Sequence, residues 1–134
     1  MVTTANPQEF SLSGLWTLVT GFGSGIGKAV ADAMKQAGAS VVVCDVNSTT
    51  KPNYFCDVAK TGVVEVMFAA IQCDLGSLDV LVNNVGVLGP TARVDELDAD
   101  AYDEYMRITL SDTFRCTKAE VPILLKTRGS TINI

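Results

Sequence analysis

The feature that most constrains this chain is a glycine-rich segment that lies between an apolar run and a helical pattern. Residues 20–27 read TGFGSGIG, and the apolar run 15–20 leads into them. Glycines allow a sharp turn and let backbone N–H groups approach an anion, because no Cβ stands in the way. A helix that begins near Gly25 would point the positive end of its dipole at that anion. The segment predicts a strand–loop–helix unit that binds a phosphate group; the alternative is a glycine turn that only packs the helix on the sheet.

Short apolar runs and helical patterns alternate along the rest of the chain. Strands are expected at 15–20, 40–44, 80–82 and 131–134, and helices at 26–37, at 62–73 and after an N-cap at Asp98. The apolar positions at helical spacing are Ile26, Val30, Ala33, Met34 and Ala37 in the first helix; Val63, Val66, Met67, Ala70 and Ile71 in the second; and Tyr102, Met106, Leu110, Phe114, Thr117 and Val121 in the third. Pro122 is expected to kink the third helix or to separate its last turn. The alternation predicts an α/β fold, a Rossmann-like doubly wound parallel sheet in three layers.

Composition narrows the class of function. The net charge is −5 and the pI is about 4.5, which argues against a nucleic-acid partner because nucleic acids require clustered Lys and Arg. The four cysteines lack a C-x-x-C spacing and histidine is absent, so neither a zinc site nor a Ser-His or Cys-His catalytic pair is expected. Residues 1–13 lack a signal-peptide pattern and the apolar runs are too short to span a bilayer, so a cytoplasmic location is expected.

Asp45 is the first residue that points to a particular phosphate-bearing ligand. It ends the valine-rich strand, about 20 residues after Gly25, where an acid can accept hydrogen bonds from an adenosine ribose diol. A carboxylate there repels a 2′-phosphate, and neither residues 46–48 nor the glycine segment offers an Arg or Lys. Asp45 therefore favours NAD over NADP; the alternative is an aspartate that only caps a turn.

A second polar motif follows the third expected strand. It reads Asn83-Asn84-Val85-Gly86, and asparagine side chains at a strand end can hold neighbouring loops by hydrogen bonds. Together with the glycine segment, Asp45, Asp57-Val58 and residues 129–134, this motif resembles the short-chain dehydrogenase/reductase family. The resemblance predicts an NAD(P)-dependent oxidoreductase that acts on alcohols or carbonyls.

The resemblance runs from about Phe10 to Ile134 and covers only the N-terminal half of the family's pattern. Residues 1–134 are therefore expected to form a single, incomplete NAD(P)-binding domain, truncated after about the fifth strand, with the catalytic half absent. A small-molecule substrate and a homo-oligomer are expected only of a full-length form. Without the rest of the domain, the strand 131–134 would be an exposed edge, and the third helix would leave apolar surface open to self-association.

The same resemblance implies roles for individual residues. Asp57 would contact adenine beside the Val58 backbone, and Asn83 would tie its strand to the strand that bears Thr20. The backbone of 85–86 would line the nicotinamide ribose. The residues expected to contact the cofactor are Thr20, Gly21, Phe22, Ser24, Gly25, Ile26, Gly27, Asp45, Val46, Asp57, Val58, Asn83, Asn84, Val85 and Gly86.

The chain departs from the family pattern at the catalytic residues. The family's serine would fall just after Ile134, and none of the tyrosines at 54, 102 and 105 has a lysine four residues later. Thr109 stands at the position of the family's active-site asparagine, and Asp112 stands where a glycine is usual three residues later. No catalytic residue is therefore assigned, and the chain alone is expected to turn over no substrate.

Two other interpretations remain open. The chain can be a catalytically inactive nucleotide-binding or dimer-partner module from a truncated or decayed gene copy, as the residues at 109 and 112 suggest. The short spacing from Asp45 to Asp57, which leaves little room for a connecting helix, points the same way. A methyltransferase uses a similar glycine turn and ribose-binding acid, but the motif at 83–86 does not suit one.

Overall fold

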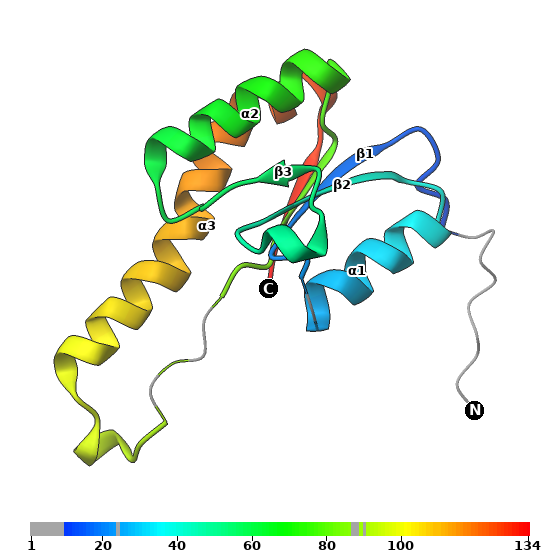
Figure 1. Ribbon diagram of the computed structural model, residues 1–134. Helices are drawn as coiled ribbons and strands as arrows, with labels where there is room; N and C mark the ends of the chain where they lie inside the picture. Colours follow the sequence, from blue (N-terminus) through cyan, green and yellow to red (C-terminus); the bar gives the residue numbers. More distant parts are fainter. Residues whose placement is uncertain (1–9, 24, 87–88, 90) are drawn as a thin grey trace, which may run out of the picture.

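The computed structural model describes residues 10–23, 25–86, 89 and 91–134, which form one parallel sheet flanked by helices (Figure 1). The described strands are β1 (Trp16–Thr20), β2 (Ser40–Asp45), β3 (Tyr54–Phe55), β4 (Val80–Asn83) and β5 (Ser130–Asn133). Their order in the sheet is β3-β2-β1-β4-β5, and all the pairs are parallel. The order reverses direction between β1 and β4, as in a doubly wound fold, so the predicted fold class is confirmed.

The helices cover both faces of the sheet. α1 (Gly25–Gln36) packs on one face, and α2 (Thr61–Leu75) and α3 (Ala99–Thr127) pack on the other (Figure 1). Adjacent residues of a strand point to opposite faces, so Leu18 joins the core beneath α2 and α3 while Val19 joins the core beneath α1. The three predicted layers are therefore present. None of the described helices combines the length and the apolar character that crossing a membrane requires.

The buried sides of α1 and α2 match the predicted sides only in part: Val30, Met34, Met67 and Ile71 face the core as expected, and other predicted positions do not. In α1, Gly27 and Ala31 are buried, whereas Ile26 is 61 % exposed. In α2, Val64, Met67, Phe68 and Ile71 are buried, whereas Val63 and Val66 face outward. Both helices carry apolar residues on more than one side, so spacing alone cannot select the side that faces the sheet. The close approach of Gly27 to the glycine loop sets the rotation of α1 instead.

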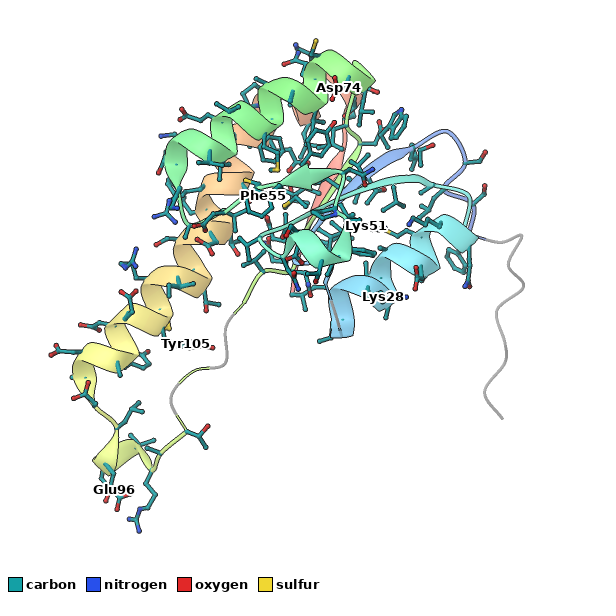
Figure 2. The ribbon with its side chains drawn as sticks, in the orientation of Figure 1. Lys28, Lys51, Phe55, Asp74, Glu96 and Tyr105 are labelled. Atoms are coloured by element: carbon teal, nitrogen blue, oxygen red, sulfur yellow. The ribbon has the colours of Figure 1, made fainter. Side chains whose placement is uncertain are left out.

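α3 begins as predicted, because the Asp98 carboxylate accepts a hydrogen bond from Ala101 N at 2.8 Å. The helix continues through Pro122 to Thr127, so the proline does not separate a last turn. Cys116 and Ile123 face the core, while Leu110 and Phe114 on another side are about two-thirds exposed. The apolar stripe of α3 is therefore open in the described part of the chain, as predicted. The acidic run before and within the start of α3 is also exposed, and Figure 2 shows Glu96 at the tip of its loop, away from the sheet.

A 3-10 turn, Ser48–Thr50, takes the place of a helix between β2 and β3. The Asn47 side chain caps it by accepting from Thr49 N at 3.0 Å, and the Asn53 side chain accepts from Val43 N at 2.9 Å. The short connection thus folds back tightly against β2, and β3 pairs through two residues only. The prediction that residues 45–57 leave little room for a helix is confirmed.

Three of the four cysteines are buried, and this arrangement predicts selective thiol reactivity. Burial raises the pKa of Cys56 to about 11 and that of Cys116 to about 12, and it raises the pKa of Cys44 well above its usual value. Since the thiolate is the reactive form, we expect one thiol, the exposed Cys73, to react rapidly with Ellman's reagent at pH 8. All four should react after denaturation in guanidinium chloride. Rapid reaction of two or more thiols in the folded chain would contradict this packing.

Candidate functional site

A cavity of about 760 Å³ lies at the carboxyl ends of β1, β2 and β4, next to the point where the strand order reverses. This is the position at which open parallel sheets bind ligands. Its walls come from the glycine loop, from the segments after β2, β3 and β4, and from α3. The described lining residues are Gly21, Gly23, Gly25, Ile26, Asp45, Val46, Asn47, Cys56, Asp57, Val58, Ala59, Asn84, Val85, Gly86, Ile108 and Asp112.

The glycine loop leaves room for a phosphate group at the start of α1. Gly21 and Gly25 have φ angles of +66° and +58°, which L side chains rarely adopt. A Cβ on Gly25 would meet no atom within 4 Å, so the space before the helix is open. The first N–H groups of a helix lack partners within the helix, and the helix dipole adds positive charge there. The loop therefore fits the pyrophosphate of a dinucleotide; Ser24, also expected to contact it, lies outside the described residues.

Thr20 and Asn84 hold the loop in this shape. The Thr20 hydroxyl donates to Val82 O at 3.3 Å and accepts from Asn84 N at 3.0 Å and from Val85 N at 3.3 Å. The Asn84 amide in turn donates to Thr20 O at 3.2 Å and to Gly21 O at 2.9 Å. The ends of β1 and β4 are thus joined by side-chain hydrogen bonds at the floor of the cavity.

The prediction that Asn83 makes this connection is wrong. The Asn83 amide donates to the Thr117 hydroxyl at 3.1 Å and to Asn133 Oδ1 at 2.9 Å, so it ties β4 to α3 and β5. Asn83 is the last residue of the strand and its side chain points to the face covered by α3. Asn84 follows the strand, where the backbone is free to turn its side chain toward β1.

Asp45 has a structural role as well as a place in the cavity wall. Its Oδ2 accepts from Gly23 N at 2.6 Å, and its Oδ1 accepts from Asn47 N at 2.8 Å. The carboxylate therefore holds the glycine loop and the turn after β2 together. Each carboxylate oxygen can accept a further hydrogen bond, so a ribose diol remains a suitable partner. The described cavity wall holds three carboxylates and no Lys or Arg.

Asp57 and Val58 form the wall after β3. The Asp57 carboxylate accepts from Ala59 N at 3.1 Å and pairs with Lys60 Nζ at 3.3 Å. The Val58 side chain is buried in the core. Any contact that Val58 makes with a ligand in the cavity would therefore involve its backbone.

Not every expected residue lines the cavity. Thr20, Gly27 and Asn83 lie beneath it, and Phe22 packs against the α1 side of the core with Lys35 Nζ 5.8 Å from its ring centroid. Thr109 is not among the lining residues, and its hydroxyl is buried without a hydrogen bond to the described residues. The sequence reasoning missed Ile108 and the cavity-facing position of Asp112. Their four-residue spacing on α3 was the available signal, because it places them on one side of a helix.

A second hollow of about 820 Å³ runs along the exposed side of α3. Its walls include the apolar side chains of Leu110, Phe114 and Val121, together with Lys118 and Asn133. Lys118 is the one charged residue in its described lining, whereas three carboxylates from separate segments line the cavity at the strand ends. The strand-end cavity is therefore the candidate functional site.

Comparisons with known proteins agree with this geometry. Residues 21–134 match the family model described as enoyl-(acyl carrier protein) reductase. A 3beta-hydroxysteroid dehydrogenase of Mediterraneibacter gnavus is 34 % identical over 87 % of this chain and 48 % of its own length. A gluconate 5-dehydrogenase from Burkholderia cenocepacia, solved with NADP and tartrate, superposes with a TM-score of 0.83 at 27 % identity, over 95 % of this chain and 55 % of the other. A 2-keto-3-deoxy-D-gluconate dehydrogenase from Streptococcus agalactiae gives a TM-score of 0.76 at 31 % identity, over 92 % and 52 % of the two chains. The chain thus spans about half the length of these proteins.

Proposed function

Because this chain belongs to the short-chain dehydrogenase/reductase family, we propose that it binds a nicotinamide dinucleotide as the cofactor-binding half of an alcohol or carbonyl oxidoreductase. The observation that carries the proposal is the cavity at the strand ends, with the glycine loop and Asp45 in its wall. When bound, the cofactor would supply hydride transfer. The chain would hold the pyrophosphate at the start of α1, the adenosine ribose at Asp45 and the nicotinamide ribose at the backbone of 85–86.

We propose that the preferred cofactor is NAD. The carboxylate of Asp45 lies in the cavity wall, and no described lining residue offers a positive charge to a 2′-phosphate. The gluconate 5-dehydrogenase structure contains NADP, so likeness of fold does not choose between the two cofactors. The choice rests on the charge of the wall.

The substitution Asp45→Asn tests this preference. It removes the negative charge, while the amide oxygen can still accept from Gly23 N. Titration calorimetry should show that the chain binds NAD+ more tightly than NADP+, and that the substitution reduces the ratio by about tenfold, or about 1.4 kcal/mol. Asp32→Asn is the matched control, since Asp32 lies on α1 outside the cavity wall and pairs with Lys28. An unchanged ratio in Asp45→Asn would contradict the assignment of specificity to this carboxylate.

A second candidate is a nucleotide-binding module without catalytic activity. The buried hydroxyl of Thr109, which bonds to no described residue, favours it, since threonine offers no amide at this position. On either candidate, the 134 residues should bind the dinucleotide and show no change in NADH absorbance with a panel of alcohols and carbonyl compounds. Measurable turnover of any of these compounds would exclude the interpretation as an inactive nucleotide-binding module.

The remaining parts of the proposal concern the whole protein. A full-length form would add a small-molecule alcohol or carbonyl substrate, and its exposed α3 stripe supports a homo-oligomer. The four free cysteines support a reducing, cytoplasmic location. Sedimentation of a full-length form would test the oligomeric state.

A further inference from the structure

Asp112 places a fixed carboxylate in the cavity wall. It lies on α3 one turn after Ile108, and its side chain is 3 % exposed. Its Oδ1 accepts from Arg115 Nη1 at 3.0 Å, and Arg115 Nε donates to the hydroxyl of Thr61, the first residue of α2, at 3.2 Å. The carboxylate is therefore held from behind by a side chain that joins the two helices.

The other oxygen of Asp112 remains available to a ligand. Oδ2 accepts no hydrogen bond from a described residue, and Asp112 lines the cavity together with Asp57 and Ile108. Burial raises the pKa of Asp112, Arg115 opposes this effect, and the charge of Asp57, which lines the same cavity, raises the pKa further. Oδ2 is not among the enclosed oxygens that lack a partner, so it is accessible at the cavity wall, and a ligand that donates to it gains a hydrogen bond to a charged group.

The geometry points to a purine amino group as that donor: we propose that Asp112, together with Asp57, selects adenine over purines that carry a carbonyl at the same ring position. An amino group has two N–H bonds, and two carboxylates can each accept one of them. The Ile108 side chain gives the flat ring an apolar neighbour. A carbonyl at that ring position has no N–H to donate and would instead face two carboxylates, whose oxygens can only accept. This inference rests on the proposed function, with the adenine end of the dinucleotide beside Asp57 as the family resemblance implies.

The experiment compares NAD+ with nicotinamide hypoxanthine dinucleotide, in which a carbonyl replaces the amino group. Calorimetry on the chain should show binding of the hypoxanthine form that is weaker by about tenfold or more, as expected for a lost hydrogen bond to a charged group. In Asp112→Asn the amide oxygen can still accept from Arg115, and the amide N–H can donate to the hypoxanthine carbonyl. The discrimination should then fall to about threefold or less. Asp103→Asn, an exposed change on the same helix, should keep the full ratio.

Each outcome separates the two proposals. Equal binding of both dinucleotides by the unmodified chain overturns this inference and leaves the proposed function standing, whereas no binding of NAD+ overturns both. If Asp112→Asn weakens both dinucleotides by the same factor, the carboxylate only positions Arg115 and the inference fails. Should Asp112→Asn not fold, Asp112→Gly takes its place, since glycine is usual in the family at this position; it removes the carboxylate and should likewise reduce the discrimination to about threefold or less.

Discussion

Gly27→Ala is expected to weaken dinucleotide binding by about 100-fold, or about 3 kcal/mol, and to destabilise the fold. A Cβ at position 27 would collide with the Gly21 carbonyl oxygen and with Asn84 Nδ2. Both atoms belong to the hydrogen bond that closes the glycine loop, and one is a backbone atom that cannot rotate away. The loop must therefore move from the start of α1, which removes the phosphate site. Overpacking of this kind costs about 1–3 kcal/mol of folding free energy.

Calorimetry with NAD+ measures the first effect, and urea unfolding measures the second. Gly62→Ala is the matched control, because a Cβ there meets no atom within 4 Å and alanine favours the helix. The control should bind NAD+ as the unmodified chain does and be equally or slightly more stable. If Gly27→Ala behaved like this control, the close approach of α1 to the loop would be unimportant for the site.

The fold was predictable where local signals agreed with each other. The apolar runs at 15–20, 40–44 and 80–82 coincide with β1, β2 and β4 to within one residue at each end. Asp98 caps α3 as its residue type suggests. The buried sides of the helices were less predictable, because α2 carries valines on two sides and only packing against the sheet selects Val64 over Val63. α3 continues past Pro122 to Thr127, although the usual effect of a proline within a helix predicts a kink or a break.

The parts of the site that a sequence motif places through its backbone could be predicted. The contacts that depend on the direction of a single side chain were harder to predict. The glycine loop, Asp45 and the segments at 57–58 and 84–86 meet in one cavity, since all of them follow the ends of neighbouring parallel strands. Asn84 has the role predicted for Asn83, because a shift of one residue at a strand end reverses the direction of the side chain. Asp112 reaches the cavity from α3, more than 50 residues after Asp57 in the chain, so no short motif contains it.

α3 also buries Glu120, a carboxyl group that no sequence pattern separated from the other acids of the helix. Its side chain is fully buried, Oε2 accepts from the Thr131 hydroxyl at 3.1 Å, and Oε1 has no partner among the described residues. Cys116, one turn earlier on the same helix, is buried as well. Burial raises the pKa of Glu120 to about 8, and the Thr131 hydrogen bond only partly opposes this.

The raised pKa of Glu120 predicts that the chain loses stability as the pH rises. Between the unfolded pKa of about 4.5 and the folded value of about 8, the folded chain holds a proton that the unfolded chain releases. The stabilisation is therefore complete below pH 4.5 and is lost progressively up to pH 8. Glu120→Gln stays neutral throughout, so it should match the unmodified chain near pH 5 and exceed its stability at pH 9 by on the order of a few kcal/mol.

Urea unfolding at pH 5, 7 and 9 measures this difference directly. Asp112, whose pKa burial also raises, contributes a slope of the same sign to both proteins and cancels in the comparison. Glu65→Gln, an exposed change on α2, should leave the pH dependence as it is in the unmodified chain. Parallel stability curves for Glu120→Gln and the unmodified chain would mean that Glu120 is charged in the folded state and that water or another group reaches Oε1. A gap that widens from pH 5 to pH 9 would instead identify this buried carboxyl as the group that limits the stability of α3 against β5 at high pH.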